Sequence, residues 1–143
     1  MNKQGVAAVD VTASVVVRSP ILREGLNKLL TDAGVSVHCE NTTRGVAPII
    51  KALRDRDADL VILDGSLCET PSPLVVSLRQ AVPAARIVII AARDSVNRIA
   101  DESLAVADGI LWSEISSEAI IQSLRLILLG GRVVPPDLLT HLL

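Results

Sequence analysis

One acidic residue stands where a strand of the chain is expected to meet solvent. Asp64 follows the apolar run 60–63, and Asp59 precedes that run. Four consecutive apolar residues between acids indicate a parallel strand that is covered on both faces. In open α/β sheets, functional groups collect at the carboxyl ends of the strands. A carboxylate there can ligate a cation, act as a base or accept a phosphoryl group, so its neighbours decide its chemistry.

Alternating strand-like and helix-like segments position Asp64. Apolar, β-branched runs predict strands at 14–17, 35–39, 60–63, 87–90 and 109–112. Helical patterns follow at 20–32, 43–54, 72–81, 95–104 and 117–129. This alternation is typical of βαβ units, so we expect an α/β fold with one doubly wound sheet of five parallel strands. The loops after residues 17, 64, 90 and 112 would then form the functional edge.

Local signals mark several helix ends. Ser19 and Pro20 form a helix start, because serine caps the first turn and proline suits its first position. Gly34 and Gly130 are expected to end helices in the left-handed conformation. The length of 143 residues fits one domain. We expect a flexible tail at 1–13, the domain at 14–131, and a linker at 132–143 that starts another helix.

The composition argues against several kinds of partner. The net charge is −2, and Trp112 is the sole aromatic residue among Phe, Trp and Tyr. A basic footprint and aromatic stacking platforms are therefore missing, and we expect that this segment binds no nucleic acid by itself. No apolar stretch approaches the roughly 20 residues of a membrane span, so we expect a cytoplasmic protein without membrane association.

Catalytic motifs are also missing. The segment after the first predicted strand contains no GxGxxG, and the chain has no P-loop. Only His38 and His141 could serve as a histidine base, and neither completes a triad. Cys39 and Cys68 are far apart and are expected to be buried or half-buried thiols in a reducing compartment. We expect a protein that is not an enzyme.

Three segments together carry a family resemblance. They are PILREGL at 20–26, DLVILD at 59–64, and 108–136 with its Gly-Gly-Arg-Val-Val-Pro-Pro end. From about Ser14 onward the chain resembles the receiver domain of two-component response regulators, especially receivers that precede a LuxR-type helix-turn-helix domain. The resemblance implies a flavodoxin-like receiver fold with strand order 2-1-3-4-5. It also implies phosphorelay signal transduction, as the N-terminal regulatory part of a transcription regulator.

The same resemblance implies a phosphorylation site that this sequence has largely lost. It places the phosphoacceptor at Asp64, with two metal-binding acids, a hydroxyl residue, a lysine and an aromatic residue around it. Those five positions hold Val17, Arg18, Ala91, Ser113 and Ile110. Mg²⁺ would depend on Asp64 alone, and a transferring phosphoryl group would lack its usual charge stabilisation. We expect no metal or other cofactor, a degenerate site, and output that does not need phosphorylation.

Arg18 offers a replacement for the missing cations. Its guanidinium could form a bidentate pair with Asp64 and hold the loops in one state. The alternative is that Arg18 faces solvent and that water or backbone caps Asp64. Arg93 could contact an effector and Glu69 an ion, but solvated loop charges are the simpler interpretation of both.

The helix at 117–129 carries the expected interface. Ala119, Gln122, Leu126 and Leu129 fall outside its core-facing arc. A contiguous apolar patch often marks an interface, so we expect a homodimer through this helix. The terminal segment 138–143 could cover the patch instead. Two other functions stay open: a conventional receiver phosphorylated on Asp64 by a histidine kinase, and a small doubly wound domain that binds a metabolite.

Overall fold

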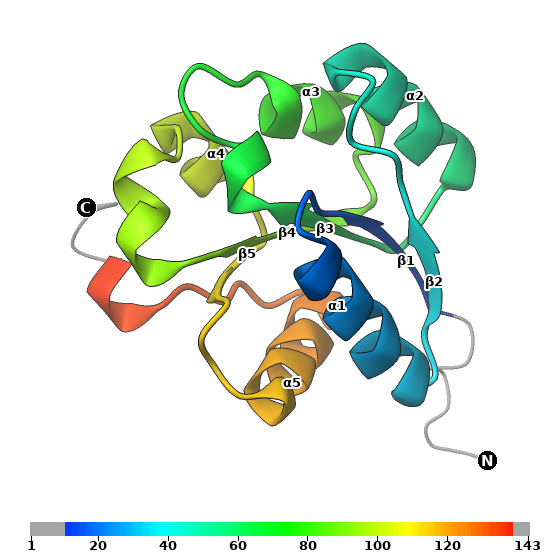
Figure 1. Ribbon diagram of the computed structural model, residues 1–143, viewed down its shortest axis with the longest axis vertical. Helices are drawn as coiled ribbons and strands as arrows, with labels where there is room; N and C mark the ends of the chain where they lie inside the picture. The colour runs from blue at the N-terminus through cyan, green and yellow to red at the C-terminus, as the bar shows by residue number, and fades with distance from the viewer. Residues whose placement is uncertain (1–10, 139–143) are drawn as a thin grey trace.

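The computed structural model describes residues 11–138 as a five-stranded parallel sheet with helices on both faces (Figure 1). The strand order is β2-β1-β3-β4-β5. This confirms the predicted fold class and strand order. The strands are β1 (Thr12–Val16), β2 (Ser36–Cys39), β3 (Leu60–Asp64), β4 (Arg86–Ala91) and β5 (Gly109–Trp112). The helices are α1 (Pro20–Asp32), α2 (Val46–Arg56), α3 (Leu74–Ala81), α4 (Asp101–Val106) and α5 (Ser117–Leu128), with 3₁₀ segments η2 (Gly65–Leu67) and η3 (Arg93–Arg98).

Two apolar clusters hold the sheet between its helices. Leu60 and Ile62 of β3 pack with α1 and α5, whereas Val61 and Leu63 pack with α2, α3 and α4. Figure 1 shows the same division of the helices between the two faces. Because both faces of β3 are covered, its side chains are apolar at every position before Asp64 rather than alternating. Aliphatic side chains supply almost all of both clusters.

Helix ends follow the local signals. The Ser19 side chain accepts a hydrogen bond from the Leu22 N–H, and Pro20 is the first residue of α1. Gly34 and Gly130 have φ values of 88° and 101°, as a left-handed helix end requires. None of the helices within residues 11–138 has the length and apolar character needed to cross a membrane.

The prediction of one helix at 95–104 is wrong. The chain forms η3 and the shorter α4, with Ile99 and Ala100 extended between them. The Ala100 N–H donates to the Cys68 carbonyl at 3.0 Å, and the Arg98 carbonyl accepts from the Thr70 N–H at 2.8 Å. These bonds to the loop after β3 occupy backbone groups that a continuous helix would need. A non-local pairing therefore overrides the local helical pattern.

The first strand begins earlier than predicted, and part of the predicted linker is described. β1 begins at Thr12, two residues earlier than predicted, because Thr12 pairs in register with Ser36 of β2. Residues 1–10 of the predicted tail and 139–143 of the predicted linker lie outside the described residues. The described part of the linker packs against the domain. Val133 bridges to Gly109 in parallel, and Leu138 is buried.

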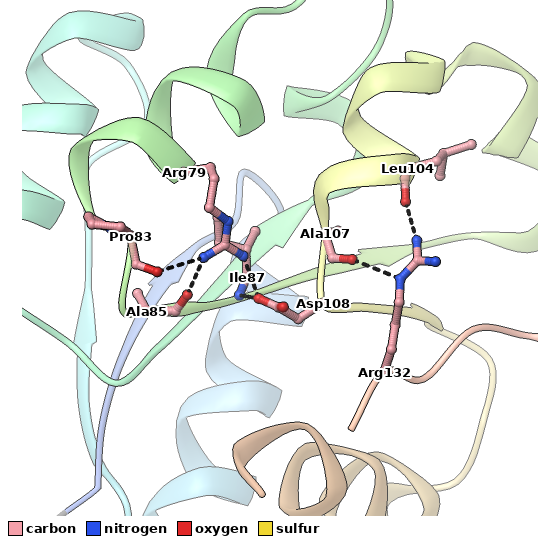
Figure 2. Close-up of polar contacts among 8 residues, drawn as sticks. All are labelled: Arg79, Pro83, Ala85, Ile87, Leu104, Ala107, Asp108 and Arg132. Carbon is pink, nitrogen blue, oxygen red and sulfur yellow. Dashed lines mark hydrogen bonds and ion pairs between the residues drawn. The ribbon is translucent and has the colours of Figure 1, made fainter. Parts of the chain in front are cut away.

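Two arginines fix the turn between α4 and β5 (Figure 2). Arg79 of α3 donates to the carbonyls of Pro83 and Ala85 and pairs with Asp108. Figure 2 also shows Arg132 of the linker donating to two carbonyls near the end of α4, at 2.7 Å for Leu104 and 3.2 Å for Ala107. The linker thus supplies a positive group where helix carbonyls lack intrahelical partners.

Candidate functional site

Asp64 ends β3, half-buried, with its carboxylate held by backbone. Oδ2 accepts from the Arg18 N–H at 3.1 Å, and Oδ1 accepts from the Ser66 N–H at 3.0 Å. Arg18 is therefore a partner of Asp64, but through its backbone. The bidentate pair between the Arg18 guanidinium and Asp64 is not formed, and no ion pair within residues 11–138 involves Arg18. Asp64 has the backbone cap that the alternative interpretation described.

Most of the other expected positions gather at the same edge of the sheet. Val17 follows β1 directly and is buried, and Ala91 ends β4 and is also buried. Ser113 follows β5, is exposed, and donates its N–H to the Ala91 carbonyl at 2.9 Å. Ile110 lies inside β5 and is fully buried. The parallel order of β1, β3, β4 and β5 brings these strand ends together, as the sequence pattern predicts.

The loop after β3 lies close against the end of β4. A Cβ placed on Gly65 would lie 2.7 Å from the Ala91 Cβ. That separation is far below an ordinary carbon–carbon contact of about 3.5–4.0 Å. Residue 65 therefore needs glycine while this loop geometry is kept.

The donor set around Asp64 does not fit Mg²⁺. This ion takes oxygen ligands in octahedral geometry, commonly one or two carboxylates together with water and phosphate. Here the two positions after β1 supply an apolar side chain, Val17, and a cationic one, Arg18. Within residues 11–138, no group of three or more His, Cys, Asp or Glu side chains is placed to hold a metal ion.

A thiol lies directly behind the loop of Asp64. The Cys68 Sγ is 3.6 Å from the Asp64 carbonyl oxygen, and the residue is fully buried. Burial, followed by the charges of Asp64 and Glu69, raises the pKa of the Cys68 thiol to about 12. Cys39 differs from expectation: it is exposed on the edge strand β2, neither buried nor half-buried. Desolvation is still the largest cause that raises the pKa of Cys39.

The charges on the neighbouring loops are paired rather than simply solvated. The Arg93 guanidinium forms an ion pair with Asp137 at 2.7 Å and lies 5.5 Å from the centre of the Trp112 ring. Glu69 pairs with Arg98 at 3.3 Å. Sequence reasoning missed both partners. Asp137 is 44 positions from Arg93, and no local pattern joins the two.

Sequence reasoning also missed a cavity of about 240 Å³ beside the Asp64 loop. It lies between the start of α2, η2 and the segment that leads into α3. Arg18, Thr42, Gly45, Ser66 and Ser72 are among the residues that line it. Its residues come from three separate stretches of the chain, at 18, 42–49 and 66–74, so only the fold brings them together.

The outer face of α5 carries exposed apolar residues. Leu126 is 56% and Leu129 86% exposed, Gln122 is exposed, and Ala119 is partly buried. Ile120, Leu124 and Ile127 form the buried face of the same helix. Leu138 packs into the cluster on the opposite side of the sheet. No described residue of the terminal segment therefore covers the α5 patch, and 139–143 lie outside the described residues.

Comparison with known proteins gives a structural likeness only. No protein-family model and no curated protein matches the sequence. A LuxR family DNA-binding response regulator from Silicibacter pomeroyi is 24% identical, with a TM-score of 0.66 over 88% of this chain and 98% of that one. A LuxR family two-component response regulator from Aurantimonas sp. SI85-9A1 is 22% identical, with a TM-score of 0.69 over 92% and 94%.

Two further solved structures extend the likeness. The RcsB response regulator of Salmonella typhimurium is 17% identical, with a TM-score of 0.66 over 92% of this chain and 65% of that one. A CheY-like receiver domain from Methylobacillus flagellatus is 17% identical, with a TM-score of 0.62 over 82% and 98%. At these identities the likeness concerns the fold. The chain has the CheY-like receiver fold of response regulators.

Proposed function

We propose that this chain is a signalling module with a receiver fold, acting in two-component signal transduction as the regulatory part of a transcription regulator. Its output does not depend on phosphorylation of Asp64. The observation that carries this proposal is the polar environment of that carboxylate. Both of its oxygens accept backbone N–H groups, and the position beside it carries the cation Arg18 instead of a metal-binding acid.

The neighbouring strand ends support the same proposal. Ala91 has no hydroxyl to bind a phosphoryl oxygen, and Ser113 has no positive charge to neutralise one. Electrostatic stabilisation is the main source of catalysis in phosphoryl transfer. Without metal-binding acids, a lysine or a hydroxyl side chain beside it, Asp64 is therefore a poor phosphoryl acceptor.

Association through the outer face of α5 is the output that we propose. Leu126 and Leu129 present an apolar surface that a second copy of the chain, or another signalling protein, can bury. The fold relative RcsB has been solved as dimers bound to DNA. By analogy, we propose that this chain self-associates. Because the proposed output does not depend on phosphorylation of Asp64, protein abundance, a partner or a ligand would set this association rather than a histidine kinase.

An amide NMR titration with Mg²⁺ and beryllofluoride, a phosphoryl mimic, tests the loss of phosphorylation. We expect no shifts at Asp64, Ala91 or Ser113 at millimolar metal. Asp64→Asn serves as the matched control. Shifts around these residues in the wild type that vanish in Asp64→Asn would contradict the proposal and establish a conventional phosphoacceptor.

A further inference from the structure

The cavity beside the Asp64 loop has the features of a binding site for an anion. We propose that it binds a small molecule carrying a phosphate group, with Arg18 as the principal charge partner. This inference deepens the proposed function, because it supplies an input other than phosphorylation of Asp64, and it rests on that function for its signalling role. Asp64, Ala91 and Ser113 do not line this cavity.

Arg18 supplies an uncommitted positive charge. It is exposed and lines the cavity, and its guanidinium has no hydrogen bond or ion pair within residues 11–138. The bond from its N–H to Asp64 fixes the backbone from which the side chain extends. A guanidinium presents several N–H groups in a planar fork that matches two phosphate oxygens.

A buried hydroxyl in the wall is also uncommitted. The Ser66 Oγ is buried and has no hydrogen-bond partner among the described residues, although Ser66 lines the cavity. A buried polar group without a partner costs free energy, so such groups in native structures call for an explanation. In the proposed complex, this hydroxyl would donate to the bound oxyanion.

The start of α2 strengthens the positive potential. Gly45 and Val46 line the cavity at the beginning of this 11-residue helix. No side chain caps the helix there, and its first turn holds no acidic residue. The first N–H groups of a helix lack intrahelical acceptors and attract anions. They lie on the same cavity as Arg18 and Ser66, so the three contributions add.

The acidic side chain that lines the cavity is already paired. Glu69 also lines the cavity, but it forms an ion pair with Arg98. Drug-sized ligands occupy clefts of about 300–1,000 Å³. A cavity of about 240 Å³ therefore fits a smaller molecule, such as a short phosphate monoester.

Titration of the 143-residue, ¹⁵N-labelled chain with inorganic phosphate and with methyl phosphate tests this inference. The buffer contains EDTA and no Mg²⁺, and chloride keeps the ionic strength constant. We expect saturable shifts of the Val46, Ala47 and Ser66 amides and of the Arg18 Nε signal at millimolar ligand. Absence of saturable shifts in the wild type would overturn the inference.

Two arginine variants separate a specific site from general attraction. Arg18→Gln should weaken binding by about tenfold or more, because it removes a charge-assisted bidentate contact. Arg44→Gln is the matched control: Arg44 precedes Gly45 and is exposed, but it does not line the cavity. We expect this control to change affinity by less than about twofold, as for a screened surface charge. Equal losses in both variants would overturn the inference.

The location of the shifts distinguishes this site from the conventional one. Because Ala91 and Ser113 do not line the cavity, we expect phosphate without Mg²⁺ to shift the Val46 and Ala47 amides and to leave the Ala91 and Ser113 amides unchanged. Shifts confined to Ala91 and Ser113 would place the anion at the conventional site and overturn the inference. Beryllofluoride shifts that require Asp64 would overturn the proposed function instead, so the two failures have different signatures.

Discussion

At the scale of single residues, Asp64 is held by two backbone donors. Arg18 and Ser66 direct their N–H groups at different oxygens of its carboxylate. Hydrogen bonds to an ionised group are stronger than neutral ones, so this pair fixes the loop after β1 against the loop after β3. The carboxylate has a structural role in this geometry that is separate from any phosphoryl chemistry.

Replacing Asp64 by asparagine should therefore cost stability. The side-chain amide offers one oxygen and one NH₂ group, so one of the two backbone N–H groups would face a donor. We expect Asp64→Asn to lower the free energy of unfolding by about 1–3 kcal/mol, measured by urea denaturation. Asp32→Asn, which breaks an exposed pair with Lys28, should cost no more than about 0.5 kcal/mol. If both variants lowered the free energy of unfolding by similar amounts, the backbone hydrogen bonds to Asp64 would contribute no more than an exposed ion pair.

The two cysteines should differ sharply in reactivity. The thiolate is the reactive form, and a pKa raised to about 12 keeps the buried Cys68 protonated at pH 8. Cys39 is exposed, although its pKa is also raised. We expect iodoacetamide at pH 8 to modify Cys39 alone in the folded chain and both thiols in denaturant, as measured by mass spectrometry. Cys39→Ser should then remain unmodified while folded, and rapid labelling of Cys68 there would contradict the buried position.

At the scale of elements, prediction succeeded where a local signal sets the boundary. α1 covers 20–32 as predicted because Ser19 and Pro20 start it, and β5 covers 109–112 as predicted. The helix predicted at 95–104 failed because Ala100 pairs with the Cys68 carbonyl, a contact that no local pattern encodes.

The candidate site shows the same division between local and non-local information. The strand ends at Asp64 and Ala91 could be placed from the apolar pattern. Whether Arg18 contacts Asp64 through its backbone N–H or through its guanidinium depends on the path of the loops after β1 and β3. The sequence pattern does not determine that path, so the contact could only be offered as one of two alternatives.

The linker is fastened to α4 and β5 by few contacts. Arg132 donates to the Leu104 and Ala107 carbonyls, and the Val133 carbonyl accepts the Ile110 N–H at 2.9 Å. Arg132→Ala should loosen this attachment and speed hydrogen exchange of the Ile110 amide by about tenfold, which corresponds to about 1.4 kcal/mol. NMR exchange measurements on the full chain would detect it. Arg125→Ala, which changes an exposed α5 arginine whose side chain has no hydrogen bond to described residues, should leave that amide unchanged. Unaltered exchange of the Ile110 amide in Arg132→Ala would mean that the backbone bridge between Val133 and β5 is sufficient to hold the linker.

At the scale of the whole molecule, the outer face of α5 is the surface proposed for self-association. A charge in the centre of an apolar interface is desolvated without a partner, so Leu126→Glu combined with Leu129→Glu should convert a dimer to a monomer. Light scattering after size-exclusion chromatography would measure the mass. Ile21→Glu changes an equally exposed apolar residue on α1 and should leave the dimer intact. A monomeric wild type, or equal dissociation in the control, would contradict this interface.

The position of Trp112 gives the molecule a built-in optical probe. Because the chain contains no Phe or Tyr and a single Trp, all of its intrinsic fluorescence comes from the indole of Trp112 at the end of β5. That ring is buried beneath the Arg93 guanidinium, which is tied to the C-terminal segment through Asp137. Fluorescence of the unlabelled protein will therefore report on one known place, where a loop of the sheet edge, the last strand and the linker meet.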